Sequence, residues 1–376
     1  MRILHIIGNL EIGGAELMLK RLVESHQGNL HYRHTVISLS AIGQVGLKLQ
    51  AIGVEVIALN MRSAWDVPLA LWRLRRIIRQ ARPDIVQTWM YHADLLGGLA
   101  ARVSGYRNIV WNIRTSALRQ SRNSLTQLII LLCAKSSRFL PAAIICCGEK
   151  AREVHLNLGY DKDKFEIVPN GYDLSSLTRS ASVRERLREK LVCNDKELLI
   201  GVCGRFDPLK DYRNFIEAAS LVARQLDGVR FVMIGRNCDS NNAQLRDWLD
   251  DFNLSDRFIL LGERGDVPDL MSALDVFCLS SKAEGFPNVV CEAMAMSTPC
   301  VVTRAGEAEF IVGTTGFTVP TESAVELAGA LLRMCRLPQQ TRTELGTAAR
   351  KRVEDNFSIS KVADRYVSVY ANVLTK

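Results

Sequence analysis

The feature that most constrains this chain is a repeated alternation of short apolar runs with stretches that have apolar residues at helical spacing. In the first 170 residues each apolar run is long enough for one buried strand and too short for a buried helix. Apolar strands separated by helices predict a parallel sheet covered on both faces. The runs are Arg2 to Gly8, Thr35 to Leu39, Val54 to Leu59, Asp84 to Thr88, Asn108 to Ile113 and Ala143 to Cys147.

A second alternation of the same kind follows an Asn170-Gly171 turn signal and a charged stretch, Arg179 to Lys190, that predicts an exposed helix. Two α/β domains in series, 1–170 and 171–357, should face each other across a cleft, with ligand held by their carboxyl-end loops. The last helix, within 358–376, has one apolar face and is expected to pack back on the first domain. The second set of strands is Leu198 to Cys203, Phe231 to Ile234, Phe258 to Leu261, Val276 to Leu279 and Cys300 to Thr303.

Charge is placed unevenly along the chain. Residues 1–150 hold 19 Lys and Arg against 8 Asp and Glu, although the whole chain carries a net charge of only +8. A basic first half predicts an anionic partner, such as nucleic acid, anionic lipid or a phosphate-bearing substrate. No motif with interleaved aromatic residues supports nucleic acid, so we expect no nucleic-acid partner.

The lengths of the apolar segments and the positions of the cysteines bear on the compartment in which the protein is expected. The longest apolar runs, Leu125 to Ala134 and Phe139 to Cys147, fall short of the ~20 residues that span a bilayer. No signal peptide precedes the first strand, so a cytoplasmic protein is expected. The ten cysteines lie mostly in apolar segments without paired CxxC spacing, which favours buried free thiols over a metal site.

The first candidate for chemistry is the glycine-rich turn from Gly8 to Glu16, which contains Gly13 and Gly14. Such a turn lets backbone amides and a helix N-terminus approach an anion closely. The glycines do not have the GxGxxG spacing of the dinucleotide fingerprint. The alternative is that the turn only packs the helix against the strand.

The second candidate is Gly204 to Asp211, which follows the first strand of the second domain. Arg205 lies just past the strand end, and Pro208 favours a turn that leaves Lys210 at the start of the next helix. Two cations on one rim can clamp a diphosphate and neutralise charge that grows on a leaving group. The alternative is two solvated surface charges.

The third candidate is the stretch AEGFPNVVCEAMA, residues 283–295, with two glutamates eight residues apart. Pro287 suits a helix start, so Glu284 lies in the preceding loop and Glu292 within the helix, whose free amides from Asn288 onward can face an anion. Glu284 could then accept hydrogen bonds from sugar hydroxyls, and Glu292 could reach a ribose. The alternative is one capping and one exposed glutamate.

Together these residues resemble the family 4 retaining glycosyltransferases of GT-B fold, over nearly the whole chain. The resemblance rests on four motifs in order: Gly13-Gly14-Ala15-Glu16, Val168-Pro169-Asn170-Gly171-Tyr172-Asp173, Gly204-Arg205 with Lys210, and Glu284-x7-Glu292. It implies two Rossmann-like domains, the first for the acceptor and the second for a nucleotide-sugar donor, with UDP favoured. It also implies retention of anomeric configuration, no metal and no other cofactor.

The resemblance assigns donor binding to a set of residues from the glycine turn, the cation loop and the glutamate stretch, with Arg264 as a guess for a neighbour of the nucleobase. Arg205, Lys210 and Glu284 are expected to act in catalysis, by holding the diphosphate and the sugar. The whole donor set is Gly13, Gly14, Arg205, Lys210, Arg264, Glu284, Gly285, Phe286, Pro287, Asn288, Val289 and Glu292.

The first half departs from the family pattern. Where many members carry His-x-His after the fourth strand, this chain has Trp89-Met90-Tyr91-His92, so His92 is the catalytic candidate near the reacting sugar, against a packing role. After the next strand, where a histidine is also frequent, the chain has Asn112 and Arg114. The acceptor side is accordingly assigned to Asn112, Arg114, Arg119 and Arg122.

The resemblance implies a hexosyl- or N-acetylhexosaminyl-type transferase that acts on a glycan or lipid-linked sugar, in polysaccharide, lipopolysaccharide or glycolipid synthesis. The segment from Arg114 to Arg138 is basic and has no acidic residue, which predicts peripheral association with an anionic membrane face. A core helix with a basic edge is the alternative. Competing functions are a GT-B epimerase, not expected to carry both glutamates, and a non-catalytic binding subunit, expected to have lost one of the charged residues.

Overall fold

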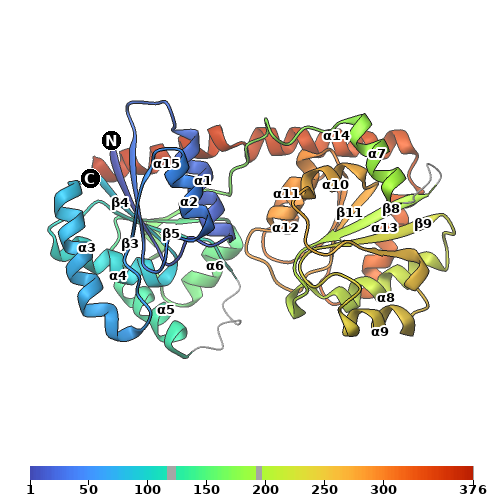
Figure 1. Cartoon of the computed structure of the whole chain (residues 1–376), viewed down its shortest axis with the longest axis horizontal. Helices are drawn as coiled ribbons and strands as arrows, with labels where there is room; N and C mark the ends of the chain where they lie inside the picture. Colours follow the sequence, from blue (N-terminus) through green and yellow to red (C-terminus); the bar gives the residue numbers. More distant parts are fainter. Residues whose placement is uncertain (117–123, 192–196, 376) are drawn as a thin grey trace. The chain divides into compact units, whose positions relative to one another are not determined.

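The computed structural model describes residues 1–116, 124–191 and 197–375. The chain forms two compact units, the first made of Met1–Tyr172 with Ile359–Lys376 and the second of Asp173–Ser358 (Figure 1). Each unit contains one parallel sheet with helices on both faces, as the alternating pattern predicts. The expected class of two Rossmann-like α/β domains is therefore confirmed.

The first unit has a seven-stranded parallel sheet in the order β3-β2-β1-β4-β5-β6-β7. Its central strands β1, β4 and β5 are almost entirely buried, because helices cover both faces. The sequence misses β7, an edge strand of three residues with no apolar run. The strands are β1 (Arg2–Ile7), β2 (Arg33–Ser38), β3 (Glu55–Ala58), β4 (Ile85–Trp89), β5 (Ile109–Ile113), β6 (Ala143–Cys146) and β7 (Phe165–Ile167).

Helices form two layers on this sheet. In Figure 1, α1, α2 and α15 lie on one side of the strands, and α3, α4 and α5 lie side by side on the other, with α4 in contact with both of its neighbours. The helices are α1 (Gly14–Ser25), α2 (Gly43–Ala51), α3 (Val67–Ala81), α4 (Met90–Val103), α5 (Ser124–Ser136), α6 (Glu149–Asn157) and α15 (Ile359–Leu374), with short 3-10 turns η1 (Ala64–Asp66) and η3 (Lys162–Lys164).

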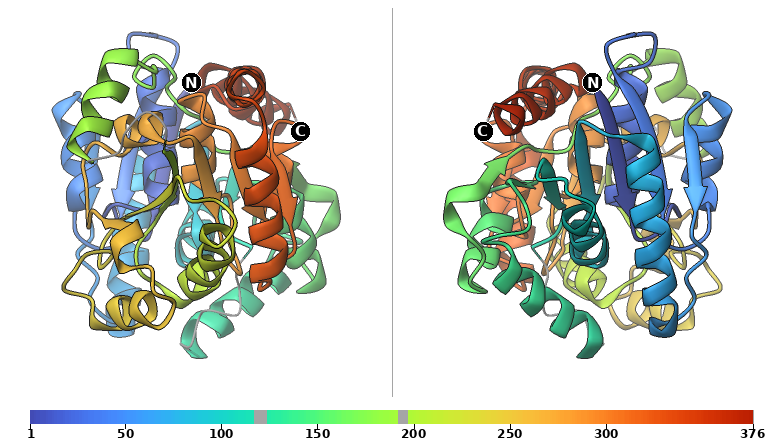
Figure 2. Two further views of the ribbon diagram at one scale, coloured as in Figure 1. Left: turned by 90° about the vertical axis from the view of Figure 1, so that its right-hand side faces the viewer. Right: turned by 90° about the vertical axis from the view of Figure 1, so that its left-hand side faces the viewer.

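The C-terminal helix α15 belongs to the core of the first unit, as expected. Val362, Tyr366 and Val373 are buried against α1 and the strands β1, β4 and β5. The Tyr370 hydroxyl donates a hydrogen bond to the buried Gln87 amide oxygen on β4. Figure 2 shows this helix, in dark red, close to the chain's N-terminus. The last residues of the chain therefore complete the fold of the first ones.

The second unit has a six-stranded parallel sheet in the order β10-β9-β8-β11-β12-β13. The sequence misses β13, again a three-residue edge strand. The strands are β8 (Leu198–Cys203), β9 (Val229–Ile234), β10 (Phe258–Leu260), β11 (Val276–Leu279), β12 (Cys300–Thr303) and β13 (Phe317–Val319). The helices are α7 (Ala181–Lys190), α8 (Tyr212–Ala223), α9 (Ala243–Asp251), α10 (Val267–Ala273), α11 (Asn288–Ala295), α12 (Ala308–Val312), α13 (Ala324–Arg336) and α14 (Gln339–Asn356), with 3-10 turns η4 (Pro208–Lys210) and η5 (Ser255–Arg257).

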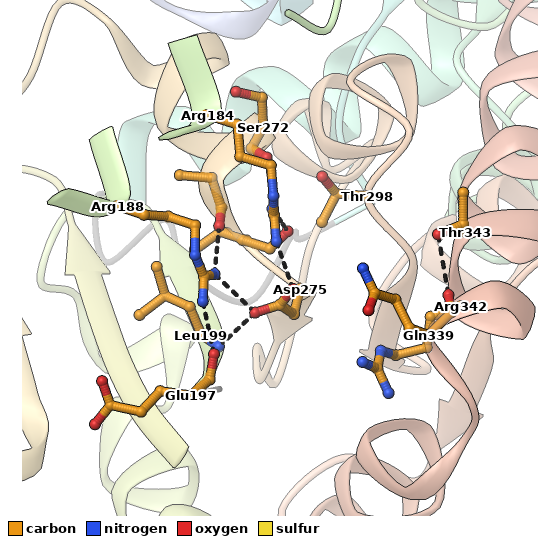
Figure 3. Close-up of polar contacts among 12 residues, drawn as sticks. Arg184, Arg188, Glu197, Leu199, Ser272, Asp275, Thr298, Gln339, Arg342 and Thr343 are labelled. Carbon is orange, nitrogen blue, oxygen red and sulfur yellow. Dashed lines mark hydrogen bonds and ion pairs between the residues drawn. The ribbon is translucent and has the colours of Figure 1, made fainter. Parts of the chain in front are cut away.

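The charged helix α7 is attached to this sheet by ion pairs as well as by apolar contacts. Figure 3 shows Arg184 and Arg188 directed at Asp275, which immediately precedes β11. The Arg184 and Arg188 guanidinium groups lie 2.6 and 2.9 Å from the two Asp275 carboxylate oxygens. The same carboxylate accepts the Leu199 backbone amide at 2.8 Å, so one side chain joins α7 to β8 and β11. The predicted exposed helix is thus docked along its arginine face.

The nine cysteines in the described parts of the chain are all buried and free, which agrees with the reduced thiols expected from the sequence. Burial raises the pKa of Cys146 and of Cys203 to about 12, so these thiols stay protonated and unreactive. No helix among the described residues has the length and apolar character that a membrane span needs.

Candidate active site

The carboxyl ends of β8 and β11 lie at the point of the second sheet where the order of the strands reverses. From β8 the chain runs outward to β9 and β10, and then returns to place β11 on the other side of β8. In open α/β sheets, ligands bind in the crevice beside the carboxyl ends of such neighbouring strands. The loops after β8 and β11 are the two that carry the predicted cations and the Glu284 motif.

The loop after β8 holds two cations in different states. Asp207 caps the 3-10 turn η4 by accepting the Leu209 amide at 3.0 Å. The same carboxylate forms an ion pair of 3.0 Å with Arg205, whose side chain is 60% exposed. Lys210 ends η4 and is only 22% exposed. Arg205 is therefore an exposed cation at the rim of the loop, whereas most of the Lys210 side chain is buried.

Lys210 and Glu284 meet across the two loops. The Lys210 Nζ lies 2.7 Å from Glu284 Oε1, and the Ser281 hydroxyl donates to the same oxygen at 2.6 Å. The Lys210 carbonyl accepts the Ser280 hydroxyl at 2.7 Å, which fixes the backbone beneath the pair. A phosphate oxygen that bound Lys210 would have to compete with this carboxylate.

Backbone contacts hold the Glu284 loop in place. A Cβ atom at Gly306, whose φ is +55°, would lie 2.3 Å from the Glu284 carbonyl oxygen, so this approach requires glycine. The Glu307 amide donates to the Gly285 carbonyl at 3.1 Å. Phe286 is buried, with its ring 5.7 Å from the Phe357 ring. Gly285 and Phe286 thus shape the loop, and the Phe286 side chain is not available to a ligand.

Helix α11 follows this loop and points its N-terminus toward the same region. Pro287 is the N-cap residue and Asn288 the first helical residue, followed by Val289, so the expected helix start is correct. The N-cap residue Pro287 makes no side-chain cap hydrogen bond. Helix N-terminal amides and the helix dipole both favour an anion at such a position. Glu292 lies inside the helix and is near Cys203 of β8, whose pKa its charge helps to raise.

The loop after β10 contains Arg264, the residue expected beside the nucleobase. Its guanidinium forms two bonds to Asp266, Nε at 2.8 Å and Nη2 at 2.7 Å, and it is exposed. These bonds lower the pKa of the Asp266 carboxyl. The stacking role of Arg264 stays a prediction, and any nucleobase contact would use a guanidinium already oriented by Asp266.

In the first unit, Gly13 and Gly14 stand at the start of α1, as expected. Gly13 is the N-cap residue and Gly14 the first helical residue. A Cβ at Gly13 would lie 2.3 Å from the Glu16 carboxylate, because that side chain folds back over the helix N-terminus. Burial raises the pKa of Glu16. An anion that binds the amides of this turn must therefore displace Glu16 or share its position.

His92 lies in the first turn of α4, directly after β4, where the resemblance places a histidine. Its side chain is exposed at the surface, and partial desolvation lowers its pKa below the ordinary 6.5. The ring is accordingly neutral at pH 7, a state that can accept or donate one hydrogen bond to a sugar. Its role near the reacting sugar stays a prediction.

Asn112 and Arg114 have surroundings that do not agree with the acceptor role expected of them. Asn112 is fully buried, and Arg114 is 8% exposed. The Arg114 guanidinium donates to Asn112 at 2.7 Å, to the Val168 carbonyl at 2.7 Å and to the Tyr366 hydroxyl. Through these bonds, Asn112 and Arg114 connect β5 to the segment that follows β7 and to α15. Arg119 and Arg122 lie outside the described residues.

Sequence reasoning missed several polar residues that organise the donor loops. Ser281 shares the Glu284 carboxylate with Lys210, and Thr303 at the end of β12 donates to the Ser281 carbonyl at 2.6 Å. Lys282 forms ion pairs of 3.6 Å with Asp211 and 3.1 Å with Glu322. A signal was present, because the polar run Ser280-Ser281-Lys282 directly follows a buried strand, where functional side chains of parallel sheets gather.

Each of the two units matches a known protein family. The description "Glycosyltransferase Family 4" matches residues 12–176, and "Glycosyl transferases group 1" matches residues 197–336. Both matches contain the loops described above. The chain belongs to the family 4 glycosyltransferases.

Individual relatives of this family 4 glycosyltransferase agree with that assignment. It is 25% identical over 311 residues to the UDP-Gal:alpha-D-GlcNAc-diphosphoundecaprenol alpha-1,3-galactosyltransferase of Escherichia coli, covering 81% of this chain and 79% of that protein. It is 23% identical to the capsular polysaccharide biosynthesis glycosyltransferase CapM of Staphylococcus aureus, covering 81% of both. Anabaena Alr3699/HepE, solved in complex with UDP, has the same fold, with a TM-score of 0.87 at 20% identity, over 99% of this chain and all of that one.

The described part of this glycosyltransferase contains no cluster of side chains suited to bind a metal ion. No group of three or more His, Cys, Asp or Glu side chains is placed to hold a metal ion among those residues. The charged groups in the loops after β8 and β11 are cations paired with carboxylates.

Proposed function

We propose that this glycosyltransferase moves a hexosyl or N-acetylhexosaminyl group from a UDP-sugar to a glycan or lipid-linked acceptor, with retention of anomeric configuration. The observation that carries the donor assignment is the Lys210–Glu284 pair, 2.7 Å apart on neighbouring loops at the reversal point of the second sheet. Use of UDP is supported by the E. coli relative, named as a UDP-Gal transferase, and by the UDP complex of Alr3699/HepE. Polysaccharide synthesis is supported by the name of the S. aureus relative, a capsular polysaccharide biosynthesis glycosyltransferase.

The site's residues have distinct tasks in this reaction. The diphosphate takes the place of carboxylates as the partner of Lys210 and Arg205, and the N-terminus of α11 adds the positive end of its helix dipole. Glu284, released from Lys210, accepts hydrogen bonds from the donor sugar hydroxyls, and Glu292 those from the ribose. Because both cations face the leaving group, charge that develops on the diphosphate is stabilised as the sugar–oxygen bond breaks. A departing phosphate oxygen then takes the acceptor proton, and the chain needs neither a protein nucleophile nor a metal.

We also propose that the protein works at the cytoplasmic face of a membrane. Helix α5 within the basic 114–138 segment buries only part of its surface, since Leu125, Leu128 and Leu131 are 47, 52 and 50% exposed. The alternative of a core helix with a basic edge explains its inner side but not these leucines. A lipid-linked acceptor would be met at such a surface. Co-sedimentation with anionic vesicles tests the association, and equal partitioning with neutral vesicles at low and high salt would contradict it.

The donor is identified by a thermal-shift screen of UDP, GDP, ADP and their sugars. Ligand at about 100 times its dissociation constant adds ~2.7 kcal/mol of stability, so the true donor stands out from the rest. Slow hydrolysis of one donor distinguishes an enzyme from a non-catalytic binding subunit. We expect Lys210→Ala and Arg205→Ala each to lower turnover roughly 100-fold, from the loss of about 3 kcal/mol of leaving-group stabilisation. Full turnover in both variants would overturn the mechanism.

A further inference from the structure

The outer side of η1 and α3 carries large apolar side chains that the fold leaves in solvent. Trp65 is 92% exposed, Leu69 49% and Trp72 58%. They are four and three residues apart, so they follow one stripe of the helix. The opposite stripe, with Ala70, Leu74 and Ile78, is buried against the first unit. Folding of the first unit therefore uses the inner stripe and gives no reason for two tryptophans on the outer one.

The same surface is strongly cationic. Between residues 62 and 82 the chain has six arginines and a single acidic residue, Asp66. The Asp66 carboxylate accepts the Arg62 and Ser63 amides at 2.8 and 3.0 Å, so it is occupied by the backbone at the helix start. The arginines are Arg62, Arg73, Arg75, Arg76, Arg79 and Arg82. We call Trp65, Leu69, Trp72, Arg75, Arg76 and Arg79 the α3 face.

Arginine and tryptophan side chains enclose a hollow on this face. The hollow, about 330 Å³ in volume, is lined by Trp72, Arg75, Arg76, Arg79 and Gln80. The Arg76 guanidinium lies 5.9 Å from the centre of the Trp72 ring. No ion pair is formed by Arg75, Arg76 or Arg79 within the described residues. These cations surround a space of headgroup size beside an aromatic ring.

The helical layer that contains α3 exposes apolar side chains at other positions as well. Helix α4 contacts both α3 and α5, and it exposes Leu99 and Val103. In the right-hand view of Figure 2, α3 (light blue) lies at the surface of the first unit. The contrast with the second unit is sharp, because its described residues include only two exposed large apolar side chains, Phe310 and Val325. Most of the exposed large apolar side chains of the described residues thus lie on one helical layer of the first unit, although Ile12, Leu30, Leu47 and Leu374 lie elsewhere on that unit.

We infer that the α3 face is the contact of this protein with an anionic lipid surface. The inference rests on the proposed membrane association and assigns its charge-dependent part to the α3 face, in the same helical layer as the exposed leucines of α5. Tryptophan favours the boundary between headgroups and acyl chains, where its ring is apolar and its N–H is solvated. Arginine binds phosphate groups through its planar fork of donors. The three arginines of this face, which form no ion pair among the described residues, match the negative potential of a cytoplasmic leaflet.

The two outer tryptophans also provide the readout. Trp89 and Trp111 are fully buried and Trp248 is partly buried in the core of the second unit, so quenchers placed in lipid reach the exposed Trp65 and Trp72 first. The full-length protein is mixed with phosphatidylcholine vesicles, with or without phosphatidylglycerol and with brominated acyl chains. We expect quenching and co-sedimentation with the anionic vesicles only, both reduced at high salt. The Trp65→Phe/Trp72→Phe variant should sediment similarly but lose most of the quenching, and retained quenching would overturn the inference.

A charge-matched pair of variants assigns the binding to the α3 face. Arg75→Gln/Arg76→Gln/Arg79→Gln is compared with Arg224→Gln/Arg246→Gln/Arg257→Gln, which removes three cations from the second unit. We expect the first to weaken partitioning roughly 100-fold at low salt, since each basic residue near an anionic surface contributes about fivefold, and the second to change it little. Equal partitioning of both variants would overturn the inference.

Donor binding separates this inference from the proposed reaction, because the thermal shift with UDP depends on loops of the second unit. Wild-type protein that binds UDP but no vesicle would contradict the membrane association and this inference, and would leave glycosyl transfer standing. Vesicle binding that the α3 substitutions do not weaken would overturn this inference alone. A lower oligomeric mass in the α3 variant, with vesicle binding unchanged, would show that a second copy covers the face instead and would likewise overturn it.

Discussion

At the scale of single residues, Glu284 has two competing partners. In the structure its carboxylate is bonded to Lys210 and Ser281, and the proposed reaction requires both Lys210 and Glu284 to bind the donor instead. We predict that Glu284→Gln binds UDP several-fold more tightly, because the diphosphate no longer competes with a carboxylate for Lys210. Its kcat should fall roughly 10-fold or more, since a charge-assisted bond to the sugar is lost. Calorimetry with UDP and steady-state kinetics measure the two effects.

Glu322→Gln is the matched control for that variant. Glu322 is 61% exposed and bonds to Lys282 at 3.1 Å, so its amide should leave both UDP affinity and turnover nearly unchanged. Weaker UDP binding in Glu284→Gln would show that the carboxylate supports the cation instead of competing for it.

Asp94 of α4 is a second residue whose protonation the fold controls. It is fully buried, and burial raises its pKa to about 7, although Thr88 donates to it at 2.5 Å. A carboxyl with a raised pKa adds stability below its unfolded value, near 3.8, and loses it as pH rises through about 7. We predict that Asp94→Asn gains stability relative to wild type by about 1.4 kcal/mol per pH unit across that range. Denaturant titrations at pH 5 and 8 measure it, and a pH-independent difference would contradict it.

The residues of the candidate site differ in how visible they are in the sequence. Arg205, Lys210 and Glu284 were predictable because each follows the end of a strand in a loop, and the parallel sheet brings such loops together. Arg114 was not, because its decisive partner Tyr366 is 252 residues away along the chain. An arginine after a strand looks the same whether it faces a substrate or a distant helix. Local pattern predicts the position of a side chain, and tertiary packing decides its partner.

At the scale of elements, three histidines join β1, β2 and the end of α1. Trp89 donates its indole N–H to His5 Nδ1 at 3.2 Å, so His5 must carry its proton on Nε2. That N–H faces His34 Nδ1 at 2.9 Å, and His34 Nε2 faces His26 Nδ1 at 3.0 Å. Because the Trp89 indole N–H can donate but cannot accept, it determines which ring nitrogen carries the proton in each of the three histidines. Each ring is neutral in the folded state, and a further proton on any of them breaks a hydrogen bond.

This histidine chain predicts a loss of stability in acid. Burial lowers the pKa of His5 and His26, and it lowers that of His34 to about 3. Because the unfolded histidines bind protons near pH 6.5, stability is complete above that pH and is lost below it, by up to about 1.4 kcal/mol per pH unit for each ring. His34→Gln, whose amide can still accept and donate, should reduce the loss between pH 7 and 5. The exposed His31→Gln is the control, and an equal effect of both would contradict this origin.

The elements themselves followed from the sequence wherever they were buried. All central strands were predicted, because a strand covered on both faces must be apolar throughout. The edge strands β7 and β13 were not, since a polar residue interrupts each of them, whereas the equally short edge strand β10 is apolar throughout and was predicted. The outer face of α3 was also overlooked. Helical periodicity marks the buried stripe, and only the structure showed that Trp65 and Trp72 lie on the other side.

At the scale of the whole molecule, the chain leaves the first unit after Tyr172 and returns to it at Ile359. These two crossings are adjacent, because the Ile359 amide donates to the Tyr172 carbonyl at 2.9 Å. The second unit is therefore inserted into the first between neighbouring points of the backbone. Helix α15 supplies Val362, Tyr366 and Tyr370 to the first core, so residues 1–172 alone lack part of their own interior.

This arrangement predicts how the units behave apart. We expect residues 173–358 to fold alone and to bind UDP, because Arg205, Lys210, Glu284 and Glu292 all belong to that unit. Residues 1–172 should melt without cooperativity and bind a hydrophobic dye, since the surface that α15 covers is apolar. Joining Tyr172 to Ile359 through a few glycine and serine residues should restore a cooperative transition, because the linker spans only one hydrogen bond. Calorimetry and UDP titration measure these outcomes. A cooperative transition in 1–172 alone would show that α15 is dispensable to the first core, and a folded 173–358 without UDP affinity would show that donor binding needs both units.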